Sequence, residues 1–177
     1  LSATDSPEIP SFVGVKNVHR MDYLEDTDAD YSDRIRQYLL ASPEKDKLDT
    51  LGRLLCSLGS TPSIVFLNYR EAVDRVYQYL RKAGFCVSSF HGAMEQKDRE
   101  RALFRFQSGC SNVLVSTDLA ARGLDITNVE NIIHYHLPMN QEAYIHRNGR
   151  TARWDREGAS YILLGPEENL DKLDCIS

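Results

Sequence analysis

Residues 63–80 read SIVFLNYREAVDRVYQYL, and this stretch decides the fold class. Ile64–Leu67 form a compact apolar run, which predicts a strand that is buried on both faces. The residues that follow place four apolar side chains on one face of a predicted helix, namely Val73, Val76, Tyr77 and Leu80. Gly84 marks the end of that helix. A buried strand followed by an amphipathic helix is the repeating unit of a parallel α/β sheet.

The same alternation continues toward the C-terminus. Further strands are predicted at residues 86–90, 113–116, 131–135 and 160–164. Between the first two, Leu103 and Phe106 mark an amphipathic helix that ends at Gly109. Strands that alternate with helices imply parallel pairing through right-handed crossovers, so we expect an α/β fold with a mostly parallel sheet covered by helices. Ligands of such sheets sit beyond the carboxyl ends of the strands, which here are the loops after Leu67, Phe90, Ser116 and Tyr135.

The N-terminal part of the chain is less regular. Residues 1–11 contain two prolines and are interpreted as a flexible entry, and residues 18–23 are predicted to form a strand. The acidic run at residues 25–30 is interpreted as a solvated loop, and residues 31–40 as a short helix. A further helix, with leucines at helical spacing, is predicted to start at Ser42-Pro43-Glu44.

Composition places the chain among soluble globular single domains. Its 177 residues carry a net charge of −5, and 42% of them are hydrophobic. No apolar run is long enough to cross a membrane and no secretory signal is visible, so we expect a cytoplasmic protein. The four cysteines show no CxxC or Cys/His pairing, which favours reduced thiols, and no metal site is predicted. The start at Leu1, without a methionine, suggests an excised piece.

The most informative stretch is HRNGRTAR at residues 146–153. If the chain is helical from Glu142 onward, His146, Arg150 and Arg153 share one face. Like charges at this spacing repel, and the glycine between them costs roughly 1 kcal/mol relative to alanine, so stability alone does not favour the arrangement. Guanidinium groups match phosphate oxygens, which makes an anion the predicted ligand of this face. The alternative is a solvated basic face neutralised by Glu142, Asp155 and Glu157.

A second stretch, STDLAARGLD at residues 116–125, leaves the carboxyl end of a predicted strand. Backbone N–H groups at such a position are free to bind phosphate. Gly123 permits a tight turn, and Asp125 could accept hydrogen bonds from a ribose hydroxyl. The alternative interpretation is that Thr117 and Asp118 only cap a helix.

A third stretch, HGAMEQKDR at residues 91–99, follows another predicted strand. Gly92 lets a backbone approach closely, and Gln96 and Arg99 are neighbours on the first turns of a helix. These side chains are suited to gripping a sugar-phosphate chain. An ordinary amphipathic helix with polar outer residues is the alternative.

In this order and spacing, the three stretches resemble the C-terminal RecA-like domain of DEAD-box RNA helicases. HRNGRTAR is similar to the sixth motif of that family, STDLAARGLD to its fifth, and HGAMEQKDR to the segment with its QxxR element. SIVFLNYRE occupies the place of the fourth motif, and Ser2-Ala3-Thr4 looks like the SAT motif that closes the first domain. The resemblance implies a RecA-like three-layer sandwich at residues 13–177, preceded at residues 1–12 by the end of an inter-domain linker.

The family resemblance implies a shared nucleotide site. ATP would bind between two RecA-like domains, with Mg²⁺ held mainly by a first domain, because this chain contains neither GxxxxGK[ST] nor a DEAD box. Arg150 and Arg153 would act as catalytic arginine fingers on the γ-phosphate and bind the nucleotide together with Gly123 and Asp125. The chain alone would then be inactive.

The resemblance also implies an RNA surface that does not read sequence, because its contacts go to phosphates and 2′-hydroxyls. Five residues would form it: Gly92, Gln96, Arg99, Thr117 and Asp118. His146 and Arg147 would couple the nucleotide site to the first domain and to the RNA. The whole protein would unwind RNA duplexes or remodel ribonucleoproteins.

Some residues depart from the family pattern, among them Asn148, Ala152 and Trp154 in the sixth motif. Tyr69-Arg70 departs after the fourth motif, which argues against an RNA contact by Asn68 or Arg70. Two other hypotheses therefore stand beside the helicase half. One is a module that only binds RNA or a protein, and the other is part of a DNA-directed translocase.

Overall fold

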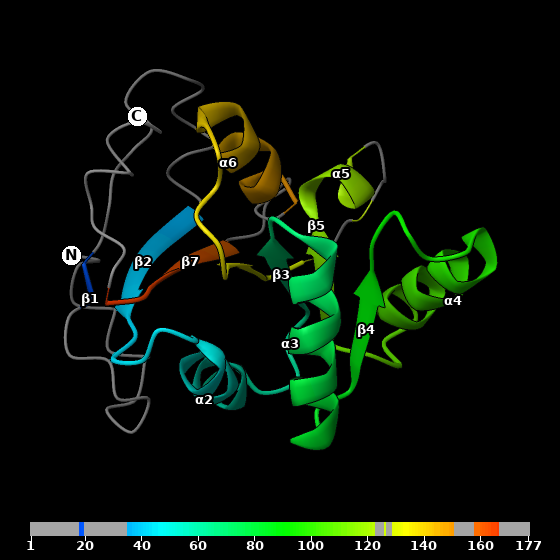
Figure 1. Ribbon diagram of the computed structural model, residues 1–177, viewed down its shortest axis with the longest axis horizontal. Helices are drawn as coiled ribbons and strands as arrows, with labels where there is room; N and C mark the ends of the chain where they lie inside the picture. The colour runs from blue at the N-terminus through cyan, green and yellow to red at the C-terminus, as the bar shows by residue number, and fades with distance from the viewer. Residues whose placement is uncertain (1–17, 20–34, 123–125, 127–128, 151–157, 167–177) are drawn as a thin grey trace.

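The computed structural model describes residues 18–19, 35–122, 126, 129–150 and 158–166. These residues form a seven-stranded sheet in the order β1-β2-β7-β6-β3-β5-β4 (Figure 1). Six strands are parallel, and only the short edge strand β1 pairs antiparallel to its neighbour. The strands are β1 (Val18–His19), β2 (Ile35–Ala41), β3 (Ser63–Leu67), β4 (Val87–Phe90), β5 (Val113–Thr117), β6 (Asn131–His134) and β7 (Gly158–Leu164). The predicted mostly parallel α/β sheet is confirmed.

Helices cover both faces of this sheet, because successive strand residues point to opposite sides. Val65 and Leu67 of β3 pack with the apolar faces of α2 (Leu48–Leu58) and α3 (Arg70–Lys82). Ile64 and Phe66 point the other way, toward α4 (Gln96–Gln107) and α5 (Asp118–Ala121). On that second face, α6 (Gln141–Asn148) packs through Tyr144 on β2 and β7. The result is the three-layer sandwich that the resemblance implied.

Glycines end two of these helices where the sequence predicted. Gly84 and Gly109 both have positive φ angles, of 95° and 85°, which residues with a Cβ rarely adopt. The chain therefore turns back toward the sheet after α3 and after α4. Among the described helices, none combines the length and the apolar character that a membrane crossing requires.

The predicted helix at residues 31–40 is wrong, because β2 occupies Ile35–Ala41. This strand pairs in parallel with β7 along its whole length. Its side chains are buried on both faces, Leu40 toward α2 and Leu39 toward α6. A strand with two buried faces lacks the alternation that marks a strand in sequence, which explains the error. Of the strand predicted at residues 18–23, Val18–His19 is observed, and the rest lies outside the described residues.

The helix start predicted at Ser42-Pro43-Glu44 is also wrong, because α2 begins at Leu48. Ser42 still follows the sheet, and its N–H donates to the carbonyl of Leu164 at 2.7 Å. The chain then turns so that the buried ammonium group of Lys47 reaches two strand ends. It donates to the carbonyl of Tyr135 and, at 3.2 Å, to that of Leu163. Satisfying this buried charge fixes where the helix can begin.

Candidate functional site

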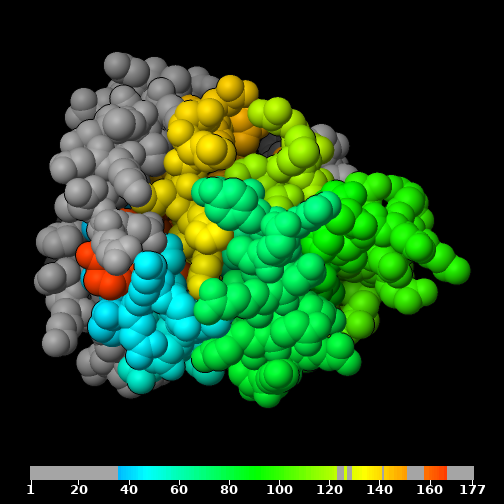
Figure 2. Space-filling view, viewed as in Figure 1, coloured from blue at the N-terminus to red at the C-terminus, as the bar shows by residue number. Residues whose placement is uncertain are grey.

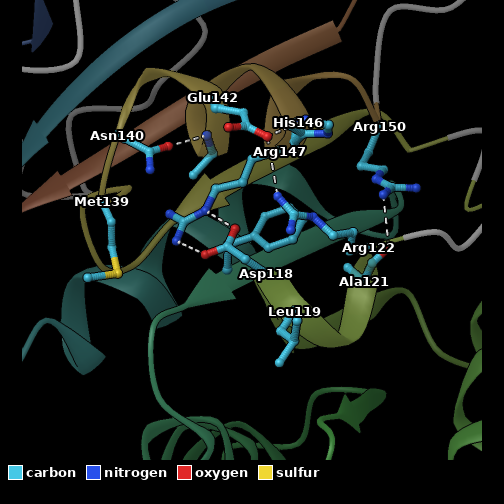
Figure 3. Close-up of a pocket in the computed structure, with 12 residues that line it drawn as sticks. Asp118, Leu119, Ala121, Arg122, Met139, Asn140, Glu142, His146, Arg147 and Arg150 are labelled. Carbon is cyan, nitrogen blue, oxygen red and sulfur yellow. Dashed lines mark hydrogen bonds and ion pairs between the residues drawn. The ribbon is translucent and has the colours of Figure 1, made fainter.

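The carboxyl ends of β3, β5 and β6 meet at one edge of the sheet, and the side chain of Arg147 lies among them. Arg147 comes from α6, and its side chain has no exposed surface. Its Nε donates to Oδ1 of Asp118 at 2.5 Å, and its Nη2 to Oδ2 at 2.6 Å (Figure 3). This is the bidentate geometry that a planar guanidinium forms with a carboxylate. It joins α6 directly to the segment that follows β5.

The remaining N–H groups of Arg147 reach the ends of two other strands. Nη2 also donates to Oδ1 of Asn68, directly after β3, at 2.8 Å. Nη1 donates to the carbonyl of His136 at 2.8 Å and faces Nδ1 of His134 at 3.3 Å. All five donors of the guanidinium therefore have acceptors inside this domain. The ring of Phe66 lies beneath it, 5.4 Å from the guanidinium carbon.

His134, the last residue of β6, is held neutral in this cluster. Burial, and after it the positive charge of Arg147, lowers the pKa of His134 to about 3. Because a guanidinium can only donate, Nδ1 of His134 is the acceptor and the proton sits on Nε2. Nε2 lies 3.1 Å from Oδ1 of Asn148 and 3.0 Å from Oγ of Ser160. The imidazole thus links α6 to β7 without adding a second positive charge.

Asn68 and His136 were not predicted as site residues, although both lie in loops that the sheet rule singled out. The backbone N–H of Asn68 donates to Nδ1 of His136 at 3.0 Å, and its side-chain amide donates to the carbonyl of Leu137 at 3.1 Å. Asn68 therefore cross-links the loops after β3 and β6 as well as binding Arg147. Their positions at strand ends were the available signal, but no residue type there suggested a partner 79 positions away.

A cavity of about 210 Å³ lies between α5 and α6 at this edge. Asp118, Arg147 and Arg150 are among the residues that line it (Figure 3). Nη2 of Arg150 donates to the carbonyl of Ala121 at 2.8 Å, so the guanidinium lies over the end of α5. The half-buried Arg150 side chain thus faces the same cavity as the segment after β5, and its binding of a phosphate stays a prediction.

The predicted helix through Arg150 is wrong in one respect, because α6 ends at Asn148. Gly149 caps it, and the N–H of Arg150 bonds to the carbonyl of Arg147 at 3.3 Å in a tighter turn. Arg150 therefore does not share a helical face with His146 through regular spacing. The turn aims its side chain at Ala121 instead.

Exposed side chains surround the mouth of this cavity. Oε1 of Glu142 lies 3.4 Å from Nη2 of Arg122 and 3.5 Å from Nε2 of His146. Leu119 and Met139 are both more than three-quarters exposed, and both line the cavity. His146, predicted to couple the site to another domain, thus lies at the rim, whereas Arg147 is enclosed within this domain.

The residues predicted to bind RNA lie at or after the carboxyl ends of β4 and β5, which are neighbours in the sheet. Oγ1 of Thr117 accepts the N–H of Ala120 at 3.3 Å and so caps α5, while Asp118 holds Arg147. Gly92 is exposed in the loop after β4. At the start of α4, Nη2 of Arg99 donates to Oε1 of Gln96 at 2.6 Å. The cap that the sequence allowed as an alternative is present, and the RNA contacts remain predictions.

The loop that carries Gly92 is tied to α3. Nε2 of His91 lies 3.0 Å from Oδ1 of Asp74, and Nδ1 of His91 accepts the N–H of Ala93 at 3.2 Å. Among the other predicted site residues, Gly123, Asp125 and Arg153 lie outside the described residues. Within the part of the chain that the structure describes, no group of three or more His, Cys, Asp or Glu side chains could hold a metal ion.

Comparison with known proteins places this geometry in a family. Residues 46–155 match the model of the helicase conserved C-terminal domain. The chain is 42% identical over 135 residues to the ATP-dependent RNA helicase fal1 of Botryotinia fuckeliana, which covers 76% of this chain and 34% of that protein. The chain thus spans about a third of the length of the curated relatives it matches.

Solved structures agree with this placement. Escherichia coli DEAD-box protein SrmB, in complex with regulator of ribonuclease activity A, superposes with a TM-score of 0.72 at 36% identity, over 79% of this chain and 82% of that one. Dbp5 of Saccharomyces cerevisiae, bound to RNA and ADP BeF3, has a TM-score of 0.72 at 32% identity, over 79% and 37%. The chain therefore belongs to the helicase conserved C-terminal domain family, among the C-terminal RecA-like domains of DEAD-box RNA helicases.

Proposed function

We propose that this chain is the second motor domain of an ATP-dependent RNA helicase that unwinds RNA duplexes or remodels ribonucleoproteins. The observation that carries the proposal is the position of Arg150. Its side chain lines the cavity at the carboxyl edge of the sheet and is steadied by the carbonyl of Ala121. The guanidinium of Arg147, three residues earlier, forms its hydrogen bonds within this domain. Arg147 therefore stabilises the turn that carries Arg150.

The residues present fit the terminal phosphate of a nucleotide held mostly by another domain. A guanidinium at the wall of an open cavity can donate two parallel hydrogen bonds to phosphate oxygens. Arg150 would hold the γ-phosphate, and Arg153, Gly123 and Asp125 remain proposed members of the same site. A bound Mg²⁺ would supply charge neutralisation to the phosphates, and we assign its ligands to the first RecA-like domain.

The function of Arg150 in this proposal is electrostatic. Negative charge that develops on the transferred phosphoryl group is stabilised by a positioned arginine, which is worth roughly 10³–10⁵ in rate in comparable enzymes. Because the nucleotide would be held by the first domain, this charge would arrive only when the two domains close. The chain alone would then have no ATPase activity.

RNA would lie along the same edge, across the loops after β5 and β4, and would be bound without sequence preference. Support comes from the adjacency of β5 and β4, which places Thr117 near Gly92, and from a relative solved with RNA. The first RecA-like domain is the proposed intramolecular partner, with His146 at the cavity rim as a contact. We also propose that the protein is cytoplasmic, which agrees with the exposed free thiols of Cys56, Cys86 and Cys110.

The decisive variant is Arg150→Ala in a protein that carries both motor domains. We expect RNA-stimulated ATPase to fall roughly 10³-fold, because the developing phosphate charge loses its counter-charge. Steady-state turnover at saturating RNA and ATP would measure this. Arg81→Ala, which removes an exposed arginine at the distal end of α3, is the matched control and should retain activity.

Normal turnover of the Arg150→Ala variant would contradict the proposal and favour a module that only binds RNA or protein. Stimulation by matched single strands of RNA and DNA separates the remaining alternative. Equal stimulation by the two would favour a DNA-directed translocase. The names of the relatives, which are RNA helicases, support the expectation that RNA stimulates more strongly.

A further inference from the structure

The outer face of α4 combines an exposed aromatic ring with positive charge. Phe104 is 69% exposed, although the same helix buries Ala102 and Phe106 against the sheet. Lys97 and Arg101 lie seven and three residues before Phe104, so all three share one face of the helix. The helix carries four basic and two acidic side chains within a chain whose net charge is −5. This face is therefore a local positive patch on an acidic protein.

Among the residues that the structure describes, no ion pair neutralises the charges on this face. Arg53, Arg70, Arg75 and Arg122 are exposed elsewhere, and each lies within ion-pair distance of a carboxylate. Within the described part of the chain, Lys97, Arg101 and Arg105 have no such partner. Their charges are available to a ligand.

Helix stability does not account for this arrangement. A basic side chain is favourable in the last turn of a helix, which explains Arg105 and also Arg81 and Lys82 of α3. Lys97 is in the first turn of α4, where the helix dipole disfavours a cation. An exposed phenylalanine likewise does not stabilise the protein through burial of its ring.

The position of the face indicates its ligand. α4 begins with Gln96 and Arg99, the pair proposed to grip the RNA backbone. The helix lies beyond β4, the last strand of the sheet, and projects at the outer side of the molecule (Figures 1 and 2). A strand that leaves the cleft at Gln96 would meet Lys97, then Arg101, and then the ring of Phe104.

We propose that this face, Lys97, Arg101, Phe104 and Arg105, extends the RNA-binding surface beyond the cleft between the motor domains. One base stacks on Phe104, and the ammonium and guanidinium groups contact adjacent phosphates. Every base has a π face, so this contact is tolerant of sequence. The inference rests on the proposed function, because it takes RNA as the ligand of the cleft.

The test uses the protein with both motor domains and a non-hydrolysable ATP analogue. Affinity is measured by fluorescence anisotropy for two oligouridines, one near the lower and one near the upper end of the range of roughly 4–16 nucleotides seen for single-strand sites. Phe104→Ala should weaken binding of the longer RNA at least about fivefold, which is the low end for one lost stacking contact, and leave the shorter RNA unaffected. ATPase at saturating short RNA should stay unchanged.

Two companion variants separate stacking from charge. Phe104→Trp should retain the affinity for the longer RNA, whereas Phe104→Leu should lose it, because leucine keeps an apolar surface but has no π face. Lys97→Ala with Arg101→Ala should reduce the salt dependence of longer-RNA binding by roughly 0.7 in log–log slope for each lost phosphate contact. The matched control is Arg81→Ala with Lys82→Ala, which removes two cations at the end of α3 and should change neither quantity.

Two results would overturn the inference. If the Phe104 and Lys97/Arg101 variants bind both RNAs as the parent protein does, the face serves another ligand class, such as an acidic protein segment. If these variants lose affinity for both RNA lengths equally, the residues act inside the cleft and do not extend the RNA-binding surface. Failure of the proposed function is distinguishable, because it would appear as normal ATPase turnover of the Arg150→Ala variant, which is measured independently of RNA affinity at Phe104.

Discussion

Arg147 and Arg150 show how two arginines three residues apart take different tasks. Arg147 donates all five of its guanidinium N–H groups, to Asp118, Asn68, His134 and the carbonyl of His136. Arg150 lies at the cavity wall and donates to the carbonyl of Ala121. The enclosed arginine fixes the geometry of strand ends that belong to different parts of the sequence. The half-buried one lines the cavity, where we propose that it binds a ligand.

Replacing Arg147 by methionine should destabilise the domain by about 2–3 kcal/mol. Removing one partner of a fully buried ion pair costs roughly 3–5 kcal/mol. The value here is set lower because the side chain of Asp118 is 34% exposed and can be partly rehydrated. Urea unfolding followed by circular dichroism measures the loss.

Two comparisons make this measurement specific. Arg147→Lys should also lose most of that stability, because an ammonium group cannot reproduce the planar fork. Arg122→Met, which removes an arginine whose side chain is 63% exposed, should change stability by less than about 0.5 kcal/mol. Equal losses at both sites would show that the Arg147 cluster contributes no special stability.

His134 should make stability depend on pH below its ordinary pKa. Its folded-state pKa lies near 3, below the ordinary value of 6.5, so the unfolded chain binds a proton that the folded chain excludes. The stability that depends on neutral His134 is fully present above pH 6.5 and is lost as pH falls toward 3. Over this range the folding equilibrium constant falls about tenfold for each pH unit.

Urea unfolding at pH 7 and pH 5.5 measures this slope. The His134→Gln variant, which cannot gain the proton, should lose less stability between the two pH values than the parent chain. His146→Gln serves as the control, because that imidazole is exposed at the cavity rim. A parent slope identical to that of His134→Gln would exclude His134 as the source.

At the scale of elements, two short helices on the same face of the sheet form the site, and each has a side-chain cap. Oγ1 of Thr117 accepts the N–H of Ala120 at the start of α5, and Oδ1 of Asn140 accepts the N–H of Ala143 at 2.8 Å at the start of α6. A helix of eight residues such as α6 is marginal by itself. Its cap and its packing through Tyr144 therefore matter for the placement of Arg147 and Arg150.

Asn140→Ala should lower the free energy of unfolding by about 1 kcal/mol, because one N–H at the first turn of α6 loses its acceptor. Asn140→Asp should retain stability, since a carboxylate can accept the same bond and favours the positive end of the helix. Thermal or urea denaturation distinguishes the two variants. Equal losses would show that the side-chain bond does not hold α6.

At the scale of the whole molecule, we propose that the described surface forms one side of a site whose other side belongs to another domain. The cavity between α5 and α6 is open, and Leu119 and Met139 stand exposed beside it. The alternation of strands and helices brings three separate loops to this edge, while the rest of the sheet serves as a rigid support. Such an edge is suited to closing against another domain around a ligand.

The 177-residue chain by itself should therefore show no ATPase activity and only weak RNA binding. The binding should weaken with salt, with a slope of roughly −0.7 for each phosphate contact. A coupled ATPase assay and anisotropy at several salt concentrations test this. Tight RNA binding by the isolated chain would contradict the requirement for a closed pair of domains.

The local sequence was sufficient for most of the architecture. Apolar runs such as Ile64–Leu67 are buried whatever their neighbours, so their strands were predicted correctly. Gly84 and Gly109 end helices because few other residues adopt their backbone angles. The segment at Ile35–Ala41 was mispredicted because its identity as a strand depends on pairing with β7, more than 100 residues later.

For this protein, the sequence alone determined the fold class, the family and the three stretches at the sheet edge, because these follow from local patterns and spacing. Only the tertiary structure decided what each side chain does there. It enclosed Arg147 among Asn68, His134 and Asp118, and it turned Arg150 off the helix toward Ala121. The physical reason is that the hydrogen bonds of a charged group depend on the acceptors around it. Those acceptors come from loops that only folding brings together.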